Sequence, residues 1–349
     1  MSQADSIPPA QDPPAKPAKP AKAEPRLFHV SSAPHLSEGT TTRRIMFEVV
    51  LAMVPMFLVA VYVFRQYAVM LTVAVVFGAL VAEALANWMR GRSQASLTDG
   101  SAIVTGVILA FSLPPMFPLY MAFIGGMVAI GLAKAVFGGL GQNLFNPAMV
   151  GRAFLMICFP VAMGVWTEPE TLRLVGAVGV DGVTMATPLQ AILDPAVASA
   201  PMGALFLGKV SGCLGETSAL AALIGGLWLV FRGVADWRQP LGVLLSAGII
   251  AAIAHAAAPE KFVGSAWYHL FGGAMMFGAF FIATDYVGAP VTPKGRLVFG
   301  CGVGVLVMVI RLFGAYPEGF MFAILIMNSV TPMIERWTTP TPFGGHVLE

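Results

Sequence analysis

The chain has 349 residues, of which 57% are hydrophobic and only 11% are charged. An ordinary soluble domain carries about 25% charged residues, so this composition excludes a soluble globular enzyme. The net charge of +2 is too small to indicate a nucleic-acid partner, and the basic residues lie at the ends of apolar segments rather than along one face.

The first 44 residues differ from the rest of the chain. They hold eight of its 26 prolines together with Ala, Lys and Ser, and no long apolar stretch precedes Ile45. A secretory signal would need an apolar stretch of about 7–15 residues. We therefore expect residues 1–44 to form a disordered cytoplasmic tail, followed by insertion through the first apolar helix.

The hydrophobic pattern from Ile45 onward predicts an all-α integral membrane protein with about ten transmembrane helices. Long stretches such as Ser101–Ala133 and Phe262–Thr284 contain no Asp, Glu, Lys or Arg, which is typical of membrane-spanning segments. The predicted spans lie near residues 45–64, 67–87, 101–117, 119–136, 149–165, 216–232, 240–257, 267–284, 297–312 and 317–334.

The distribution of Lys and Arg predicts the orientation of these spans, because cytoplasmic loops carry the excess of positive charge. With the N-terminal tail in the cytoplasm, 15 of the 20 basic residues, Lys134 and Arg152 included, fall on the inner side; five, Arg311 included, fall outside. This asymmetry favours an even number of spans with both termini cytoplasmic. Residues 335–349 are then a cytoplasmic C-terminal tail, and the long connection 166–211 is an ordered cap on the outer face.

Two parts of the chain are similar to each other, which predicts repeats at 45–165 and 212–334. Asp99-Gly100-Ser101-Ala102 matches Glu216-Thr217-Ser218-Ala219, and Gly125-Gly126 with Gly131 matches Gly272-Gly273 with Gly278. Five helices per repeat would give the two halves inverted topology, with a central site at the Gly/Pro-broken segments. The alternative is that Gly and Pro are simply common in membrane helices.

The most specific motif lies in the outer connection, at Asp181-Gly182-Val183-Thr184-Met185-Ala186-Thr187. It resembles the motif at which a flavin transferase links the phosphate of FMN to a threonine hydroxyl. That resemblance makes Thr187 the attachment residue and Asp181, Thr184 and Ala186 recognition positions. A hydroxyl is a weak nucleophile, which is why an outside enzyme is needed. The alternative is a solvated turn.

Further motifs extend the resemblance over residues 40–335. They are Gly138-Gly139-Leu140-Gly141-Gln142-Asn143-Leu144-Phe145-Asn146-Pro147-Ala148, Gly215-Glu216-Thr217-Ser218-Ala219, Phe280-Phe281-Ile282-Ala283-Thr284-Asp285, Val291-Thr292-Pro293-Lys294-Gly295-Arg296 and Tyr316-Pro317-Glu318-Gly319. Together they resemble the D subunits of Rnf ion-translocating electron-transport complexes, which are related to the B subunit of the sodium-pumping NADH:quinone oxidoreductase.

The resemblance implies a urea-channel-like fold in the bacterial inner membrane, with the FMN-bearing loop in the periplasm. It implies a subunit of a ferredoxin:NAD oxidoreductase with little activity alone, covalent FMN, and riboflavin inside the bundle. The implied partners are iron–sulfur subunits, a second flavin-bearing subunit and the flavin transferase. Because the outer flavin and the cytoplasmic electron donors lie on opposite sides of a core about 30 Å thick, a further electron carrier is needed.

Acidic residues in or beside the apolar spans are the second signal, because an ionised carboxylate there is costly and usually functional. They are Glu83, Asp99, Glu216, Asp285 and Glu318, and they are candidates for a Na⁺ or H⁺ pathway. Asp285 and Glu216 are the strongest. Asp99 and Glu216 have the alternative role of helix caps. For Lys134 we expect snorkelling to the cytoplasmic face, with pairing to an acid or contact with a cofactor as the alternatives.

Three cysteines, Cys158, Cys213 and Cys301, are too widely spaced to predict a metal site within this chain. Two other functions remain open. A solute channel or transporter without a redox cofactor would use the same inverted repeats, and a membrane scaffold would have no site at all. Bound flavin distinguishes the electron carrier from both.

Overall fold

The computed structural model describes residues 41–167, 187–189, 201–208, 210–260, 262, 264–314 and 318–340. Residues Met1–Gly39 form a unit separate from Thr40–Glu349, and the fold described below is that of the second unit. Its described residues are predominantly helical, which confirms the all-α class. The motif residues Asp181, Thr184 and Ala186, the predicted tail up to residue 40 and most of the connection 166–211 lie outside the described residues.

The first half of the chain holds one set of helices. They are α1 (Thr42–Phe64), α2 (Gln66–Met89), a 3₁₀ turn (Gln94–Thr98), α3 (Ser101–Phe111), α4 (Leu119–Ile130) with a π-helix (Gly131–Ala135), α5 (Pro147–Cys158) and α6 (Pro160–Met163). After α8 (Met202–Leu207), the second half holds a 3₁₀ turn (Leu214–Glu216), α9 (Ala219–Phe231), α10 (Arg238–Ala257), α11 (Ala266–Phe271), α12 (Met275–Phe277) with a π-helix (Gly278–Ile282), α13 (Pro293–Phe313) and α14 (Phe320–Thr338).

Every predicted span contains helix in the structure. Helices α1, α2, α10 and α13 are long and apolar enough to cross a membrane, and α3, α4, α5 and α9 are shorter apolar helices. The ends of α1 and α14 differ by a few residues from the predicted limits of the two tails. Helix α1 begins inside the predicted tail because the Thr41 hydroxyl accepts a hydrogen bond from the Arg44 N–H and caps it, and α14 continues to Thr338, beyond the predicted start of the C-terminal tail.

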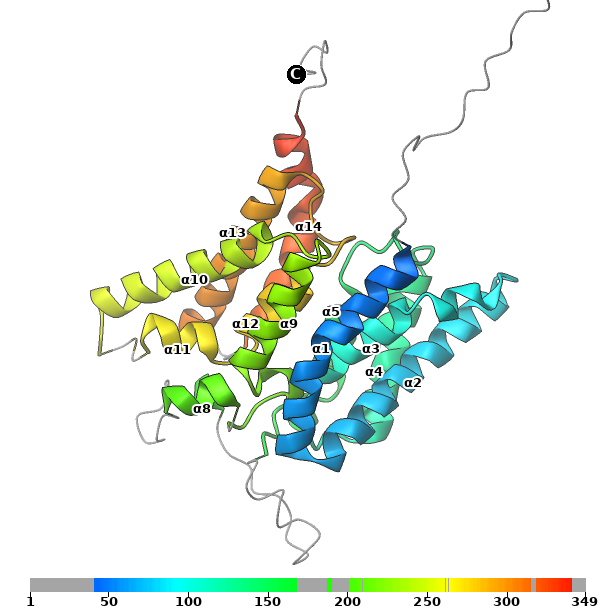
Figure 1. Cartoon of the computed structure of the whole chain (residues 1–349), viewed down its shortest axis with the longest axis horizontal. Helices are drawn as coiled ribbons and strands as arrows, with labels where there is room; N and C mark the ends of the chain where they lie inside the picture. The colour runs from blue at the N-terminus through cyan, green and yellow to red at the C-terminus, as the bar shows by residue number, and fades with distance from the viewer. Residues whose placement is uncertain are drawn as a thin grey trace, which may run out of the picture. The chain divides into compact units, whose positions relative to one another are not determined.

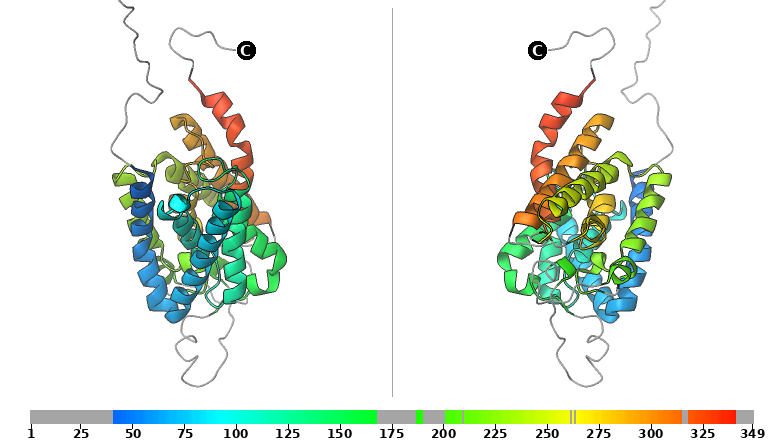
Figure 2. Two further views of the ribbon diagram at one scale, coloured as in Figure 1. Left: turned by 90° about the vertical axis from the view of Figure 1, so that its right-hand side faces the viewer. Right: turned by 90° about the vertical axis from the view of Figure 1, so that its left-hand side faces the viewer.

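Helix α1 begins and α14 ends at the same end of the bundle (Figure 1; Figure 2). We call this the tail end. Helix α8 lies at the opposite end, which we call the loop end (Figure 1). The shared end agrees with an even number of spans, and the assignment of the tail end to the cytoplasm stays a prediction.

The helices pack by the same scheme in the two halves. In the first half, α2 packs on α3 and α4, and α4 packs on α5. In the second half, α10 packs on α11 and α13, and α13 packs on α14. The halves meet where α1 packs on α9 and α5 on α14. By this packing order, α4 of the first half corresponds to α13 of the second. The matched glycines of the sequence instead make α4 correspond to the α11–α12 segment, and both π-helices begin at matched glycines. The inverted repeat and the urea-channel-like fold stay predictions.

Glycines bring the helix backbones into direct contact at two of these crossings. A Cβ atom on Gly126 of α4 would lie 2.2 Å from the Val75 carbonyl oxygen of α2, and one on Gly225 of α9 would lie 2.0 Å from the Ala52 carbonyl oxygen of α1. Helices in a membrane associate by such close packing, since lipid supplies no hydrophobic force between them. The α1–α9 contact therefore holds the halves together and fixes the walls of the space between them.

Candidate functional site

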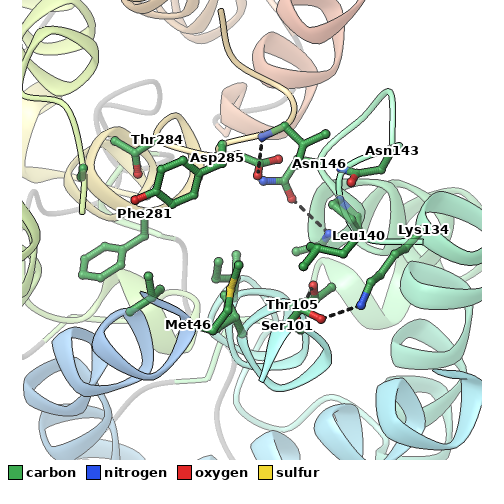
Figure 3. A pocket seen from close by; sticks show the side chains of 18 of the residues that line it. Met46, Ser101, Thr105, Lys134, Leu140, Asn143, Asn146, Phe281, Thr284 and Asp285 are labelled. Carbon is green, nitrogen blue, oxygen red and sulfur yellow. Dashed lines mark hydrogen bonds between the residues drawn. The ribbon is translucent and has the colours of Figure 1, made fainter. Parts of the chain in front are cut away.

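A cavity of about 90 Å³ opens between the two halves near the tail end (Figure 3). Its volume is enough for several water molecules. The lining combines apolar side chains with amides, hydroxyls, one lysine and one aspartate; it includes Met46, Ser101, Lys134, Asn143, Asn146, Phe281, Thr284 and Asp285. We call it the tail-end cavity.

Hydrogen bonds of two asparagines, Asn146 and Asn328, join the two halves at the wall of the tail-end cavity. Asn146 caps α5, because its Oδ1 accepts hydrogen bonds from the N–H groups of Ala148 and Met149. The Asn146 N–H donates to Asn328 Oδ1 at 3.1 Å, and Asn328 Nδ2 donates to the Gly288 carbonyl at 2.8 Å. The start of α5 is thus bound to α14 and, through it, to the loop after Asp285.

Asp285 reaches this cavity, as its place beside a broken helix suggested (Figure 3). Its Oδ1 accepts a long hydrogen bond, 3.4 Å, from the Val287 N–H. Its Oδ2 is buried and has no partner among the described residues. A buried acceptor without a partner is costly, so this oxygen is placed to receive a ligand. The ion role of Asp285 stays a prediction.

Lys134 does not snorkel to the surface; the structure bears out the alternative of an acidic partner. Its Nζ donates to Glu83 Oε1 at 2.9 Å, to Glu83 Oε2 at 3.0 Å and to Ser101 Oγ at 2.6 Å. The Lys134 and Glu83 side chains are only 4% and 7% exposed. The lysine comes from the π-helix after α4, which turns it toward α2 and α3 instead of along the helix axis. Glu83 therefore neutralises a buried lysine.

Asp99 bonds to the first residue of α3, although the N-cap position of this helix is Gly100, which has no side-chain cap. Its Oδ1 accepts hydrogen bonds from the Ser101 N–H at 2.7 Å and the Ser101 hydroxyl at 2.5 Å. Glu216 does not cap α9, since the Ser218 hydroxyl does so by accepting from the Ala221 N–H. Instead, Glu216 Oε2 accepts a hydrogen bond from the Cys213 N–H at 3.5 Å, in a capping box on the 3₁₀ turn Leu214–Glu216. The cap alternative therefore holds for this turn and not for α9, and the ion roles of both acids stay predictions.

A second polar site lies inside the bundle. Arg152 of α5 is 7% exposed and donates to Glu318 Oε2 at 2.6 Å and to the Ser112 carbonyl at the end of α3. The Cys213 thiol donates to the same carbonyl at 3.1 Å. One ligand atom each of Cys213, Glu216 and Glu318 lies within 4.8 Å of the others. Two of the five predicted acids are thus brought together here.

Sequence reasoning missed the two buried arginines. It counted Arg152 and Lys134 as inner-loop charges and Arg311 as an outer one, yet all three are buried, and Arg311 donates to the carbonyls of His269 and Gly272. When these three buried residues are left out, 13 basic residues remain on the predicted inner side and four on the outer side, so the predicted inner side still has the excess of positive charge. The signal that could have found them was the rule that an intramembrane cation pairs with an intramembrane acid.

The segment at Thr187 is anchored near the loop end. The Tyr268 hydroxyl of α11 donates to the Pro188 carbonyl at 3.3 Å. The Leu189 side chain lies against Gly273, where an added Cβ would be 2.6 Å from Leu189 Cδ1. Thr187 is 2% exposed. The two residues after the predicted attachment residue therefore pack against α11 and the junction between α11 and α12.

Asp236, in the turn between α9 and α10, accepts hydrogen bonds from Arg238 and Arg296 near the tail end. Partial burial raises the pKa of Asp236, but the Arg238 N–H and the two guanidinium groups outweigh this and hold the pKa below the ordinary 3.8. A lowered pKa adds stability that is present above the ordinary value and is lost as the pH falls through the folded-state pKa.

We therefore expect Asp236→Asn to lower the melting temperature of the detergent-purified protein at neutral pH. The difference from the wild type should shrink as the pH falls below 3.8 and vanish below the folded-state pKa, because only there is the wild-type carboxylate protonated in both states. Thermal unfolding followed across this range measures the difference, with the exposed Glu260→Gln as control. A difference that grows toward acid pH would contradict the assigned pKa direction.

Comparison with known proteins matches residues 29–344 to the NQR2, RnfD, RnfE family. The D subunit of the proton-translocating ferredoxin:NAD(+) oxidoreductase complex of Clostridium ljungdahlii is 38% identical, over 93% of this chain and 98% of its own length. The D subunit of the Na(+)-translocating ferredoxin:NAD(+) oxidoreductase complex of Acetobacterium woodii is 41% identical, over 90% and 95%. The D subunit of an ion-translocating oxidoreductase complex of Stutzerimonas stutzeri is 40% identical, over 86% and 92%.

Proposed function

Because the chain belongs to the NQR2, RnfD, RnfE family, we propose that it is a membrane subunit of an ion-translocating ferredoxin:NAD⁺ oxidoreductase. The observation that carries the proposal is similarity over nearly the whole chain to relatives named as such subunits. The multi-pass helices around a polar interior support a place in the membrane part of the complex. Its proposed partners are iron–sulfur subunits, a second flavin-bearing subunit and, during maturation, a flavin transferase.

The proposed electron carrier is FMN attached to Thr187 through a phosphoester. The residues present suit this group, since the acceptor hydroxyl is there and the backbone that follows is held by Tyr268 and by the Leu189–Gly273 contact. When bound, the flavin supplies one-electron and two-electron chemistry. At 2% exposure the hydroxyl is inaccessible to another enzyme, so we expect the transferase to act before this segment packs on α11.

A riboflavin in the tail-end cavity is part of the same proposal. The amides of Asn143 and Asn146 would hydrogen-bond to the ring edge, and Phe281 and Met46 would contact its faces. The cavity of about 90 Å³ is smaller than the roughly 300–1,000 Å³ of ordinary ligand pockets. Binding therefore requires side chains at the open mouth to move, and Met46, with its flexible side chain, is placed to do so.

The transported ion enters the proposal as Na⁺ or H⁺, because the names of the relatives include both. We propose that the reduction state of the flavins shifts the equilibrium between two arrangements of the halves, with Asp285 and the Glu216–Glu318 pair exposed to different sides. The tail end is then the cytoplasmic side of the bacterial inner membrane, and the Thr187 segment is periplasmic.

Inverted membrane vesicles test this function. We expect vesicles with the whole complex to reduce NAD⁺ with reduced ferredoxin and to accumulate the ion, and vesicles without this chain to lose both. Restoring the gene should restore both. Unchanged electron transfer without the chain would reject the proposal. Solute flux through the purified chain in liposomes, without bound flavin, would instead support the channel alternative.

A further inference from the structure

Two carboxyl groups face each other inside the bundle. Glu216 is 6% exposed, and the side chain of Glu318 is 9% exposed. One carboxylate oxygen of Glu216 lies within 4.8 Å of one of Glu318, yet Oε1 of each is buried and has no donor among the described residues. Two ionised carboxylates are both acceptors and repel one another. They can form a hydrogen bond only if one of them carries a proton.

The positive charges around the pair do not replace that proton. Arg152 forms an ion pair with Glu318 through Oε2 alone, at 2.6 Å. Arg311 lies nearby but directs its terminal nitrogens to the carbonyls of His269 and Gly272. The remaining titratable neighbour is Cys213, and its Sγ acts as a donor to the Ser112 carbonyl, which makes it a neutral thiol. The Oε1 atoms of both carboxyl groups are therefore left without a donor among the described residues.

A metal ion does not suit this space. Cys213, Glu216 and Glu318 have ligand atoms close enough together, but Arg152 Nη1 lies 3.6 Å from Cys213 Sγ and places a positive charge beside it. Hard cations take six or more oxygen ligands, and the pair offers two oxygens that lack partners. The cavity beside Arg152 and Glu318 measures about 10 Å³, which holds at most one water molecule.

We infer that Glu216 and Glu318 form a buried proton-binding site that holds one proton between the two carboxyl groups. The proton forms an O–H bond on one Oε1 and donates to the other, and its release breaks only that bond. This inference rests on the proposed function and deepens it, since it makes the pair a site for H⁺ rather than for Na⁺.

The pair also lies beside the Thr187 segment. A Cβ on Gly273 would be 3.7 Å from Glu318 Oε1 and 2.6 Å from Leu189 Cδ1, so the acid and the leucine both lie against the same glycine. Gly273 has a φ of 65°, a conformation that glycine adopts without strain. A proton bound here offsets the charge of an electron that arrives at a flavin on Thr187.

Infrared spectroscopy of the whole purified complex tests the site. We expect a carboxylic-acid C=O band at neutral pH that shifts in D₂O and is absent in Glu216→Gln. The glutamine amide keeps the size of the side chain and donates to Glu318 Oε1, so the fold is preserved. Glu260→Gln, at an exposed position, is the matched control and should keep the band. Saturating Na⁺ should leave the band in place.

Two results would overturn the inference. Identical C=O regions in the wild type and Glu216→Gln would mean that both carboxyl groups are ionised, and loss of the wild-type band on adding Na⁺ would mean that Na⁺ occupies the site. In-gel flavin fluorescence and ferredoxin-dependent NAD⁺ reduction are measured on the same preparations. A complex that passes both assays but lacks the band rejects the proton site alone, whereas a band without flavin or electron transfer rejects the proposed function.

Discussion

Thr187→Ala is expected to abolish covalent flavin on this chain completely. The phosphoester needs a hydroxyl oxygen, and alanine has none. The measurement is the intact mass of the denatured protein together with in-gel flavin fluorescence, after expression with the flavin transferase. The wild type should show the mass of an FMN adduct and fluorescence, and the variant should show neither.

Two further variants separate chemistry from folding. Thr187→Ser keeps a hydroxyl at the buried position and should recover part of the fluorescence. Thr98→Ala removes an exposed hydroxyl at the tail end and should leave the adduct unchanged. An adduct that persists in Thr187→Ala would place the flavin on another residue, and an unmodified wild-type chain beside an active transferase would favour the channel alternative.

Glu83→Leu is expected to destabilise the protein by about 3–5 kcal/mol, because it leaves the buried ammonium of Lys134 without its counter-charge. Only Ser101 Oγ would then remain as a polar partner of the three contacts. Lys134→Met should cost a similar amount by leaving Glu83 uncompensated. Denaturant unfolding of the detergent-purified protein measures the loss of stability in both variants. If unfolding is irreversible, the yield of folded protein ranks the variants instead.

The double variant Glu83→Leu with Lys134→Met supplies the control for this pair. Replacing both partners of a buried ion pair by apolar groups is often close to neutral, and Ser101 keeps its hydrogen bond to Asp99. We therefore expect the double variant to be more stable than either single variant. Single-variant costs that simply add would show that Lys134 and Glu83 do not depend on one another.

Hydrophobicity alone placed every predicted span on helix, because a membrane helix is recognised from local composition; it did not find α8 or the 3₁₀ turn Gln94–Thr98. It could not locate where helices break. The predicted span 101–117 ends as α3 at Phe111, since Pro114 and Pro115 follow and cannot continue it. The predicted span 267–284 is divided into α11, α12 and a π-helix around Gly272 and Gly273. Such breaks depend on what the freed backbone contacts, and that is a tertiary property.

The acids of the site show the same limit. Glu216 and Glu318 can be recognised in the sequence as unusual, because an ionised carboxylate in an apolar span is costly. Their partners, however, lie far away along the chain. Arg152 and Glu318 are 166 residues apart, and Lys134 and Glu83 are 51 apart. No local pattern connects such pairs, so Lys134 and Arg152 were counted as loop charges. Flavin attachment at Thr187 is a prediction of a different kind, because a modifying enzyme recognises a short continuous sequence; it stays a prediction until the adduct is measured.

Three neighbouring phenylalanines of the interior, whose rings are tilted against one another, have a consequence for the resting membrane. Phe281 lines the tail-end cavity, Phe277 lies beside Arg152 and Glu318, and their rings are 5.9 Å apart, with Phe111 6.0 Å from Phe277. Moving one charge down a potential of 100 mV releases about 2.3 kcal/mol, so a wet path between the two polar regions would discharge the cell. If ions follow the proposed path between these two regions, the apolar rings form a barrier on that path, and the rings have to move before an ion passes.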